Sequence, residues 1–144
     1  MTVTIPTTEW VVDCLRTADL GRIAQRYAGN VLLDLDMPMW RVQLKGRDAA
    51  SQVLAEQLRE LPNLRTTWVR ATLADDAVVA EYELRWDGPD GEQLSRAVSI
   101  FRLAADQITE HSDYCCGAWT PQDIARNKAE APIVRWKPTT GGPE

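Results

Sequence analysis

Apolar residues recur every three or four positions in four stretches of the chain, which predicts four helices. The first helix begins at Thr7 or Thr8, either of which can cap it, and a second short helix is predicted over residues 20–27. The clearest pattern lies between Gly46-Arg47 and Pro62. Its apolar face consists of Ala50, Val53, Leu54, Leu58 and Leu61.

The fourth helix has the strongest start signal in the chain. Thr120 can cap it, Pro121 occupies its first position, and Asp123 lies in its first turn. The helix is predicted to end near Ala131, directly before a proline.

Alternation of apolar and polar residues predicts strands in the rest of the chain. One strand spans residues 31–36, stopped by Pro38, and a short one spans 41–44. Four more are predicted at residues 64–74, 77–87, 92–104 and 107–116. Short turns between the last four predict an antiparallel meander. We therefore predict a single α+β domain, residues 1–144 with flexible ends at 1–6 and 137–144, whose helices cover one face of a curved antiparallel sheet around an internal pocket.

Composition and charge exclude several classes of protein. Among 144 residues, 21 Asp and Glu outnumber 16 Lys and Arg, which argues against a nucleic-acid partner. No apolar run approaches the 18–20 residues of a membrane helix. Cys14, Cys115, Cys116 and the single His111 do not match a zinc pattern, so we expect no metal. The odd number of thiols and the lack of a signal peptide predict a cytoplasmic protein.

Three segments carry a family resemblance. They are Thr-Ala-Asp-Leu at residues 17–20, Asp-Leu-Asp-Met-Pro at 34–38 followed by Gly46-Arg47, and residues 107–114, Gln-Ile-Thr-Glu-His-Ser-Asp-Tyr. In this order and spacing they resemble the NTF2-like superfamily, in particular its SnoaL-like and limonene-epoxide-hydrolase-like members, over about residues 8–120. The resemblance implies a cone-shaped fold with a deep pocket and a homodimer formed through the outer face of the sheet.

The last predicted strand holds the first candidate site residues. Alternation places His111, Asp113 and Cys115 on one face. The resemblance implies that Asp113 is an acid–base residue inside the pocket. His111 is expected one step deeper on the same face, and we predict that it shares the acid–base catalysis with Asp113. Cys115 is then a small residue of the pocket or of the core.

The first strand holds a second pair of carboxylates. Asp34 and Asp36 share one face, and the resemblance implies that this face points into the pocket, where Asp36 would assist catalysis. The alternative is that Leu33 and Leu35 fill the interior instead, because burying leucine is favourable and burying a carboxylate is not.

Six tryptophans against one phenylalanine suggest an aromatic pocket. Tyr82 and Leu84 stand where epoxide-hydrolase-like members carry an Arg and an Asp, which argues against epoxide hydrolysis. The candidate substrate-binding residues are Asp34, Tyr82 and Cys115 with Trp10, Trp40, Trp68, Trp86 and Trp119, although Trp68 and Trp86 suit a dimer interface equally well. At least three of these five tryptophans are expected to line one cavity with Asp113.

The function predicted from these residues is a SnoaL-like cyclase or isomerase for a small, largely apolar, polyketide-like intermediate, as in natural-product biosynthesis. A carboxylate in an apolar pocket can transfer protons near neutral pH without a cofactor. The alternatives are a pericyclase, whose aromatic pocket folds its substrate for a cycloaddition, an epoxide hydrolase, and a non-catalytic module that binds a ligand or a protein.

Overall fold

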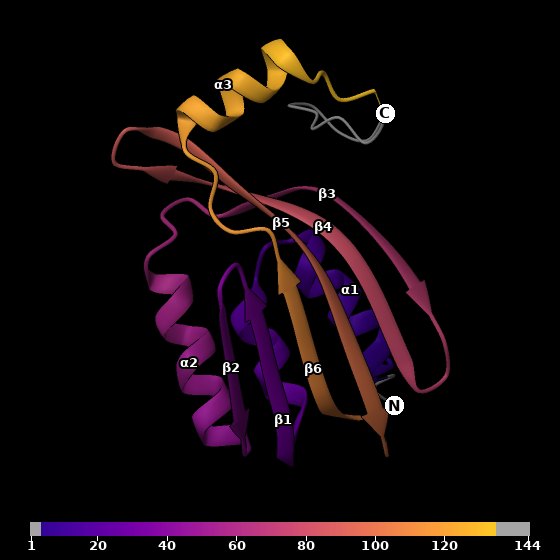
Figure 1. Ribbon diagram of the computed structural model, residues 1–144. Helices are drawn as coiled ribbons and strands as arrows, with labels where there is room; N and C mark the ends of the chain where they lie inside the picture. The colour runs from indigo at the N-terminus through magenta and orange to yellow at the C-terminus, as the bar shows by residue number, and fades with distance from the viewer. Residues whose placement is uncertain (1–3, 135–144) are drawn as a thin grey trace.

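The computed structural model describes residues 4–134, in which helices cover one side of a single sheet (Figure 1). Along the chain the elements are α1 (Thr7–Arg16), η1 (Leu20–Arg26), β1 (Tyr27–Met37), β2 (Trp40–Lys45), α2 (Arg47–Arg59), β3 (Arg65–Leu73), β4 (Ala77–Gly88), β5 (Gly91–Ala104), β6 (Gln107–Cys115) and α3 (Pro121–Glu130). The predicted α+β class is confirmed. Of the ends predicted to be flexible, residues 1–3 and 137–144 lie outside the described residues.

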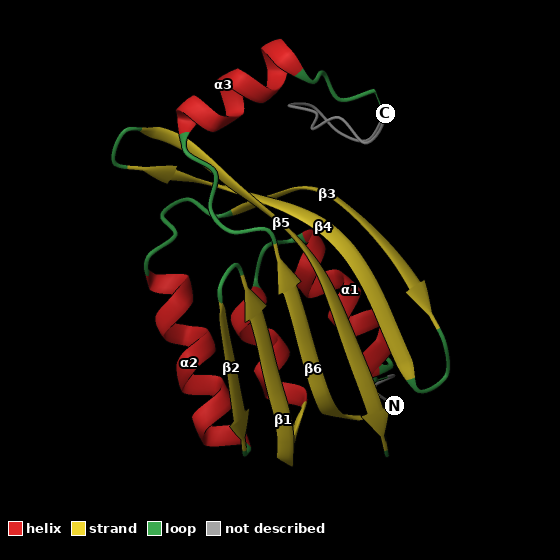
Figure 2. Ribbon diagram, in the orientation of Figure 1, coloured by secondary structure: helices red, strands yellow, loops and turns green. Residues whose placement is uncertain are grey.

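The six strands form one curved, open sheet in the order β2-β1-β6-β5-β4-β3 (Figure 2). Neighbouring strands are antiparallel except β1 and β6, which run parallel. The expectation of a wholly antiparallel sheet is therefore wrong at this pair. The chain leaves β1, passes through β2, α2 and the β3–β6 meander, and returns with β6 in the direction of β1. This return places Leu33 opposite His111 and Leu35 opposite Asp113.

The core lies between the sheet and the helices α1, η1 and α2. We call the side of the sheet that faces these helices the inner face. On β1 it carries the buried Val31, Leu33 and Leu35, and on β4 it carries the buried Val78 and Ala80. Burial of each large apolar side chain contributes about 1.5–3 kcal/mol, so the inner face is where most of the folding free energy arises.

The second predicted helix is a 3₁₀ helix, and the following strand begins earlier than predicted. Leu20 and Ile23 of η1 are buried, as the helical spacing requires. The strand begins at Tyr27 rather than at residue 31, because Tyr27 pairs with Ile108 of β6. A register shift between Tyr27 and Leu32 shows that the first part of β1 is irregular, which explains why alternation did not reveal it.

The start of α3 agrees with its sequence signals. The Thr120 hydroxyl accepts a hydrogen bond from the Asp123 backbone N–H at 3.1 Å, and the Asp123 carboxylate accepts one from the Thr120 N–H at 2.9 Å. This capping box satisfies two N–H groups that the helix itself leaves unpaired. In Figure 1, α3 extends past the end of the sheet. None of the helices within residues 4–134 combines the length and the apolar character needed to span a membrane.

Candidate functional site

A carboxyl group lies in the middle of the inner face, on β6. Asp113 is in register with Leu35 of β1 on one side and with Ser99 of β5 on the other. Asp113 Oδ1 accepts hydrogen bonds from the Ser99 hydroxyl at 2.9 Å and from the Tyr82 hydroxyl at 3.3 Å. The two hydroxyl oxygens lie 2.7 Å apart, and both residues are buried, whereas Asp113 is partly exposed. We call Tyr82, Ser99 and Asp113 the Asp113 cluster.

Burial controls the protonation of this cluster. It raises the pKa of the Asp113 carboxyl above its ordinary value, and the hydrogen bonds from Ser99 and Tyr82 lower that pKa only in part. Burial also raises the pKa of Tyr82 well above its ordinary value, so this phenol stays protonated and donates. A carboxylate with a raised pKa is a stronger base than an exposed one, and its acid form persists closer to neutral pH. The cluster therefore has the chemistry of a general acid–base group.

His111 lies on the same face of β6, as alternation predicts, but in a different environment. It is buried, its ring centroid lies 4.2 Å from that of Phe101, and its Nδ1 lies 2.6 Å from the Tyr27 hydroxyl. Burial lowers the pKa of His111 to about 3. The imidazole is therefore neutral at physiological pH, which leaves no imidazolium to act as the partner acid. Its bond to Tyr27 fixes the orientation of the ring.

Two residues of the site were missed by the sequence analysis. Ser99 is the hydroxyl-bearing residue between Ala97 and Phe101 at alternate positions of β5, and this interruption of an apolar inner face was the signal that could have revealed it. Tyr27 was assigned to the end of a helix, so its pairing with β6 and its contact with His111 were not foreseen.

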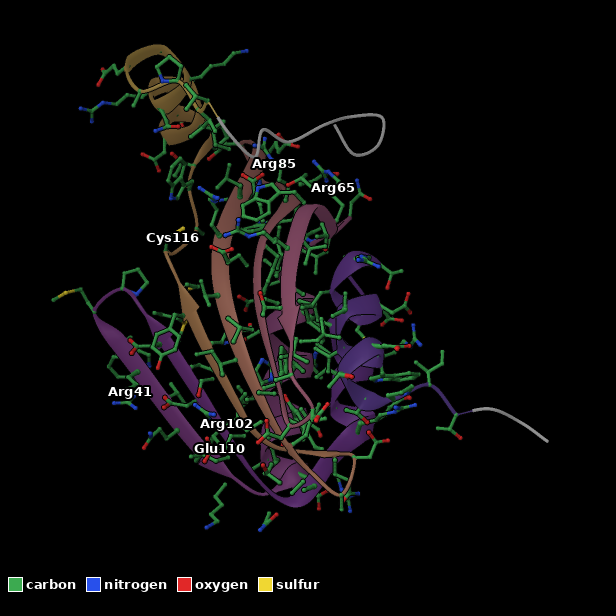
Figure 3. All side chains as sticks on the ribbon, turned by 90° about the vertical axis from the view of Figure 1, so that its right-hand side faces the viewer. Arg41, Arg65, Arg85, Arg102, Glu110 and Cys116 are labelled. Carbon is green, nitrogen blue, oxygen red and sulfur yellow. The ribbon has the colours of Figure 1, made fainter. Side chains whose placement is uncertain are left out.

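Asp34 and Asp36 do not face the helices, and the prediction that they point into a pocket is wrong. Leu33 and Leu35 occupy the inner face, so both carboxylates lie on the opposite side of β1, the outer face. Asp34 there accepts two hydrogen bonds from Arg41 of β2, at 3.0 and 2.7 Å, and Arg41 holds the pKa of Asp34 below its ordinary value. Figure 3 shows Arg41 on the side of the sheet away from α1.

The tryptophans do not form one wall, and the prediction that at least three of them line a cavity with Asp113 is wrong. Trp68 lies on the outer face of β3, where the Arg96 guanidinium stacks on its ring. The register shift between Thr66 and Trp68 directs Val69 inward in place of Trp68. Trp40 follows the β1–β2 turn and is 67% exposed.

The other three candidate tryptophans lie in three further environments. The guanidinium groups of Arg22 and Arg26 stack on the ring of Trp10 on α1, with their central carbons 4.4 and 4.3 Å from the ring centroid. Trp86 is buried in the core at the end of β4 and donates to Gln93 at 3.2 Å. Trp119 is tied to β5 through backbone hydrogen bonds with Leu94. Any binding role of these residues remains a prediction.

Tyr82 and Cys115 lie on the inner face with Asp113, in agreement with the predicted alternation. Tyr82 belongs to the Asp113 cluster, and Cys115 follows Asp113 by two residues on the same strand, opposite Ala97. Cys116 is exposed (Figure 3) and borders a groove of about 460 Å³ between α3 and the segment after β6. In residues 4–134, no group of three or more His, Cys, Asp or Glu side chains is placed to hold a metal ion.

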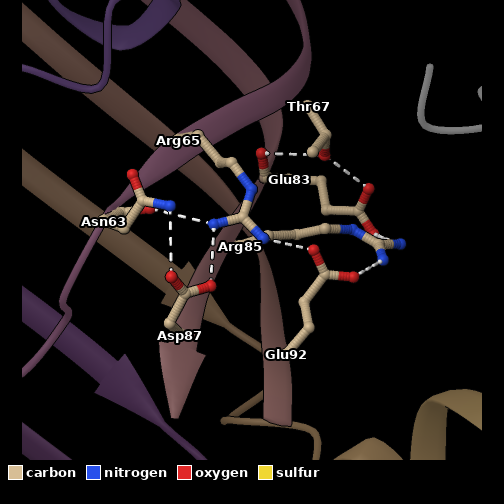
Figure 4. Close-up of polar contacts among 7 residues, drawn as sticks. All are labelled: Asn63, Arg65, Thr67, Glu83, Arg85, Asp87 and Glu92. Atoms are coloured by element: carbon tan, nitrogen blue, oxygen red, sulfur yellow. Dashed lines mark hydrogen bonds and ion pairs between the residues drawn. The ribbon is translucent and has the colours of Figure 1, made fainter. Parts of the chain in front are cut away.

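The outer face carries a dense network of charges near the β4–β5 hairpin (Figure 4). Arg85 bonds to Glu92 at 2.7 Å and to the buried Glu83 at 3.3 Å, while Arg65 bonds to Glu92 and to Asp87. Thr67 and Asn63 complete the network as donors to Glu83 and Asp87. These acidic groups have cationic partners, unlike Asp113, whose partners are neutral hydroxyls.

Solved structures of NTF2-like proteins share the arrangement of a curved, open sheet with helices over one face. Residues 8–111 match the family model of the SnoaL-like domain. The chain therefore belongs to the SnoaL-like domain family of the NTF2-like superfamily, which confirms the resemblance seen in the sequence. A comparison with curated protein sequences finds no match.

Solved structures show the same fold. A protein from Jannaschia sp. CCS1 assigned as a SnoaL-like polyketide cyclase is 18% identical, with a TM-score of 0.61 over 92% of this chain and 99% of that one. A protein from Xanthomonas campestris assigned as a polyketide cyclase is 17% identical, with a TM-score of 0.58 over 82% and 93%. A protein of ketosteroid isomerase-like fold from Catenulispora acidiphila is 16% identical, with a TM-score of 0.57 over 88% and 95%. At these identities the likeness concerns the fold alone.

Proposed function

We propose that this chain is an enzyme, a cyclase or isomerase of the SnoaL-like type that moves a proton at Asp113 on a small, largely apolar, polyketide-like substrate without a cofactor. The observation that supports this most is the Asp113 carboxyl itself. It is partly exposed on the inner face, its hydrogen-bond partners within residues 4–134 are neutral hydroxyls, and its raised pKa suits proton transfer.

The reaction begins with Asp113 as a base. The carboxylate takes a proton from a carbon next to a substrate carbonyl, and the electron pair of that C–H bond becomes the enolate. In an isomerisation, Asp113 returns the proton to a different carbon. In a ring closure, the enolate carbon forms a bond to a second carbonyl carbon of the same molecule, and the oxygen of that carbonyl takes the proton from Asp113. In both cases Asp113 ends in the protonation state in which it began.

Two structural findings favour proton transfer over the alternatives. The pericyclase hypothesis depended on a wall of tryptophans, and these lie in separate environments, with Trp68 on the outer face, Trp40 exposed and Trp86 in the core. Epoxide hydrolysis in related enzymes uses an Arg and an Asp where this chain has Tyr82 and Leu84, and Tyr82 here bonds to Ser99 and Asp113. The substrate is expected to be apolar because the side chains beside Asp113 on the inner face, such as Leu35 and Ala97, are apolar.

The test is proton exchange on apolar ketones. The exchange of α-protons for deuterium in a panel of bicyclic aryl ketones, such as 2-tetralone, is followed by proton NMR in D₂O. The native chain should accelerate exchange, and Asp113→Asn should reduce the rate by roughly 10²–10⁴-fold. Asp34→Asn, which alters a carboxylate on the outer face, is the matched control and should change nothing. Equal exchange by the native chain and Asp113→Asn would contradict the proposal and favour a non-catalytic binding module.

We also propose that the chain forms a homodimer through its outer face. On this face Tyr114 is 48% exposed and Val79 is 40% exposed, and the partly buried Val98 and Ile100 lie between them on β5. Burial of this apolar strip against a second copy would remove it from water. Sedimentation should show a dimer that Tyr114→Lys weakens and that Ala55→Lys, on the exposed side of α2, does not. A monomeric native chain would contradict the proposal.

A further inference from the structure

Ser99 holds a position in the Asp113 cluster that sequence spacing did not reveal. It is completely buried on β5, directly opposite Asp113 in the sheet register. Its hydroxyl lies between the two other members of the cluster, 2.9 Å from Asp113 Oδ1 and 2.7 Å from the Tyr82 oxygen. Its neighbours on the inner face of β5, Ala97 and Phe101, have no polar side-chain atoms. Among the described residues, the side-chain partners of the Ser99 hydroxyl are therefore Asp113 and Tyr82.

Counting protons gives this chain of hydrogen bonds a direction. An ionised carboxylate can only accept, so Ser99 uses its one proton to donate to Asp113 Oδ1. The Tyr82 hydroxyl must then donate to the Ser99 oxygen, with the longer 3.3 Å contact to Oδ1 as a secondary one. The Tyr82 hydroxyl thus donates to Ser99 and the Ser99 hydroxyl donates to Oδ1, and hydrogen bonds that follow one another in this way strengthen each other.

The other carboxylate oxygen is left available. Asp113 Oδ2 has no hydrogen-bond partner among residues 4–134, although the residue is in contact with solvent. A carboxylate anchored through one oxygen cannot rotate freely, so its second oxygen keeps one direction. That is the requirement for a base that must reach a particular carbon-bound proton.

We propose that Ser99 is a positioning residue for proton transfer by Asp113: its hydroxyl anchors Oδ1, so that Oδ2 is the oxygen that takes and returns the proton. The proposal rests on the proposed function and extends it to a residue that does not touch the substrate. Tyr82 supports Ser99 from the far side and orders its hydroxyl.

The experiment compares Ser99→Ala, Ser99→Thr and Ser112→Ala. The alanine variant removes only the hydroxyl, and threonine restores it. Ser112 lies one residue from Asp113 on the outer face, so its variant is a matched control. The carboxyl resonance of Asp113 is titrated by carbon-13 NMR in each variant, and α-proton exchange of 2-tetralone is measured as kcat and KM. Thermal unfolding of each variant confirms that it is folded.

Loss of the Ser99 hydroxyl should raise the pKa of Asp113, because a hydrogen bond to the ionised form is lost. It should also lower kcat about tenfold with little change in KM, because the carboxyl is no longer aligned. Ser99→Thr should return both quantities toward those of the native chain, and Ser112→Ala should leave them unchanged. A purely structural role for Ser99 would instead lower thermal stability without moving the titration of Asp113.

The outcomes separate this inference from the proposed function. If Asp113→Asn abolishes exchange while Ser99→Ala changes neither the titration nor kcat, Ser99 does not position Asp113 and the proposed function stands. If the native chain and Asp113→Asn exchange protons equally, the proposed function fails and with it the catalytic part of this inference. The titration still reports whether Ser99 anchors the carboxylate, and an unchanged titration in Ser99→Ala would overturn that as well.

Discussion

On the outer face near the β4–β5 hairpin, two arginines and three acidic residues bond to one another within a few ångströms, whereas the inner face of the same sheet holds the Asp113 carboxyl among hydroxyls and apolar side chains. On the outer face, arginines lower the pKa of Glu92, and Arg41 does the same for Asp34. On the inner face, burial raises the pKa of Asp113. The pKa values of acidic residues on the two faces of one sheet are thus shifted in opposite directions.

This contrast shows that the number of charges does not identify the functional site. Ion pairs between exposed side chains, such as Arg65 and Asp87, contribute little free energy of folding. A carboxyl without a cation, placed among apolar side chains, costs folding free energy, and its basicity rises for the same reason. The following predictions test whether the two faces differ in this way.

The largest expected difference is in packing. Phe101 is completely buried on β5 beside His111, so Phe101→Ala should lower the free energy of unfolding by about 3–5 kcal/mol. Val79→Ala, on the outer face of β4, should lower it by less than about 1 kcal/mol. Urea denaturation at neutral pH measures both. Similar losses for the two variants would contradict the division of the sheet into a packed and an open face.

A second difference should appear as the pH falls. The native state keeps His111 neutral, with a pKa of about 3 against the ordinary 6.5. The contribution of His111 to stability is therefore complete above pH 6.5, and it is lost as the pH falls toward 3, by up to about 1.4 kcal/mol per pH unit. His111→Gln should reduce this slope between pH 4 and pH 6, measured by denaturation at each pH.

The chain offers a clear control for this prediction, because His111 is its only histidine. No other imidazole can produce a slope in that range. If His111→Gln and the native chain lose stability in parallel between pH 6 and pH 4, the imidazole is not held neutral.

The smallest expected effect belongs to the exposed ion pair on the outer face. Arg41→Ala removes the 2.7 Å contact with Asp34 and should lower the stability only slightly, because exposed ion pairs contribute little. The cost should shrink further at high salt, because salt screens exposed charges. Denaturation at low and high ionic strength measures it. A loss of several kcal/mol, independent of salt, would show that the outer face is not an ordinary solvated surface.

Local signals in the sequence predicted the positions of the helices and most strands, and part of the site. Thr120, Pro121 and Asp123 act through hydrogen bonds within one turn, so their pattern identified the start of α3. Asp113 and His111 follow from alternation on one strand and from the family resemblance, and both lie on the inner face.

The remaining features depend on contacts between distant segments. Alternation on β1 fits either orientation of the strand, so it could not decide whether Asp34 or Leu35 lies on the inner face. The pairing of β1 with β6 decides this. The register shift that turns Trp68 outward arises from pairing with β4. The role of Ser99 requires three strands to bring hydroxyls from β4 and β5 to a carboxyl on β6.

The most direct test of the central claim is a carbon-13 NMR titration of the Asp113 and Asp34 carboxyl groups in the native chain. The resonances are identified by their loss in Asp113→Asn and Asp34→Asn. We expect the pKa of Asp113 to lie above the ordinary 3.8 and that of Asp34 to lie below it. A pKa of Asp113 at or below 3.8 would contradict the assignment of Asp113 as the acid–base group of this protein.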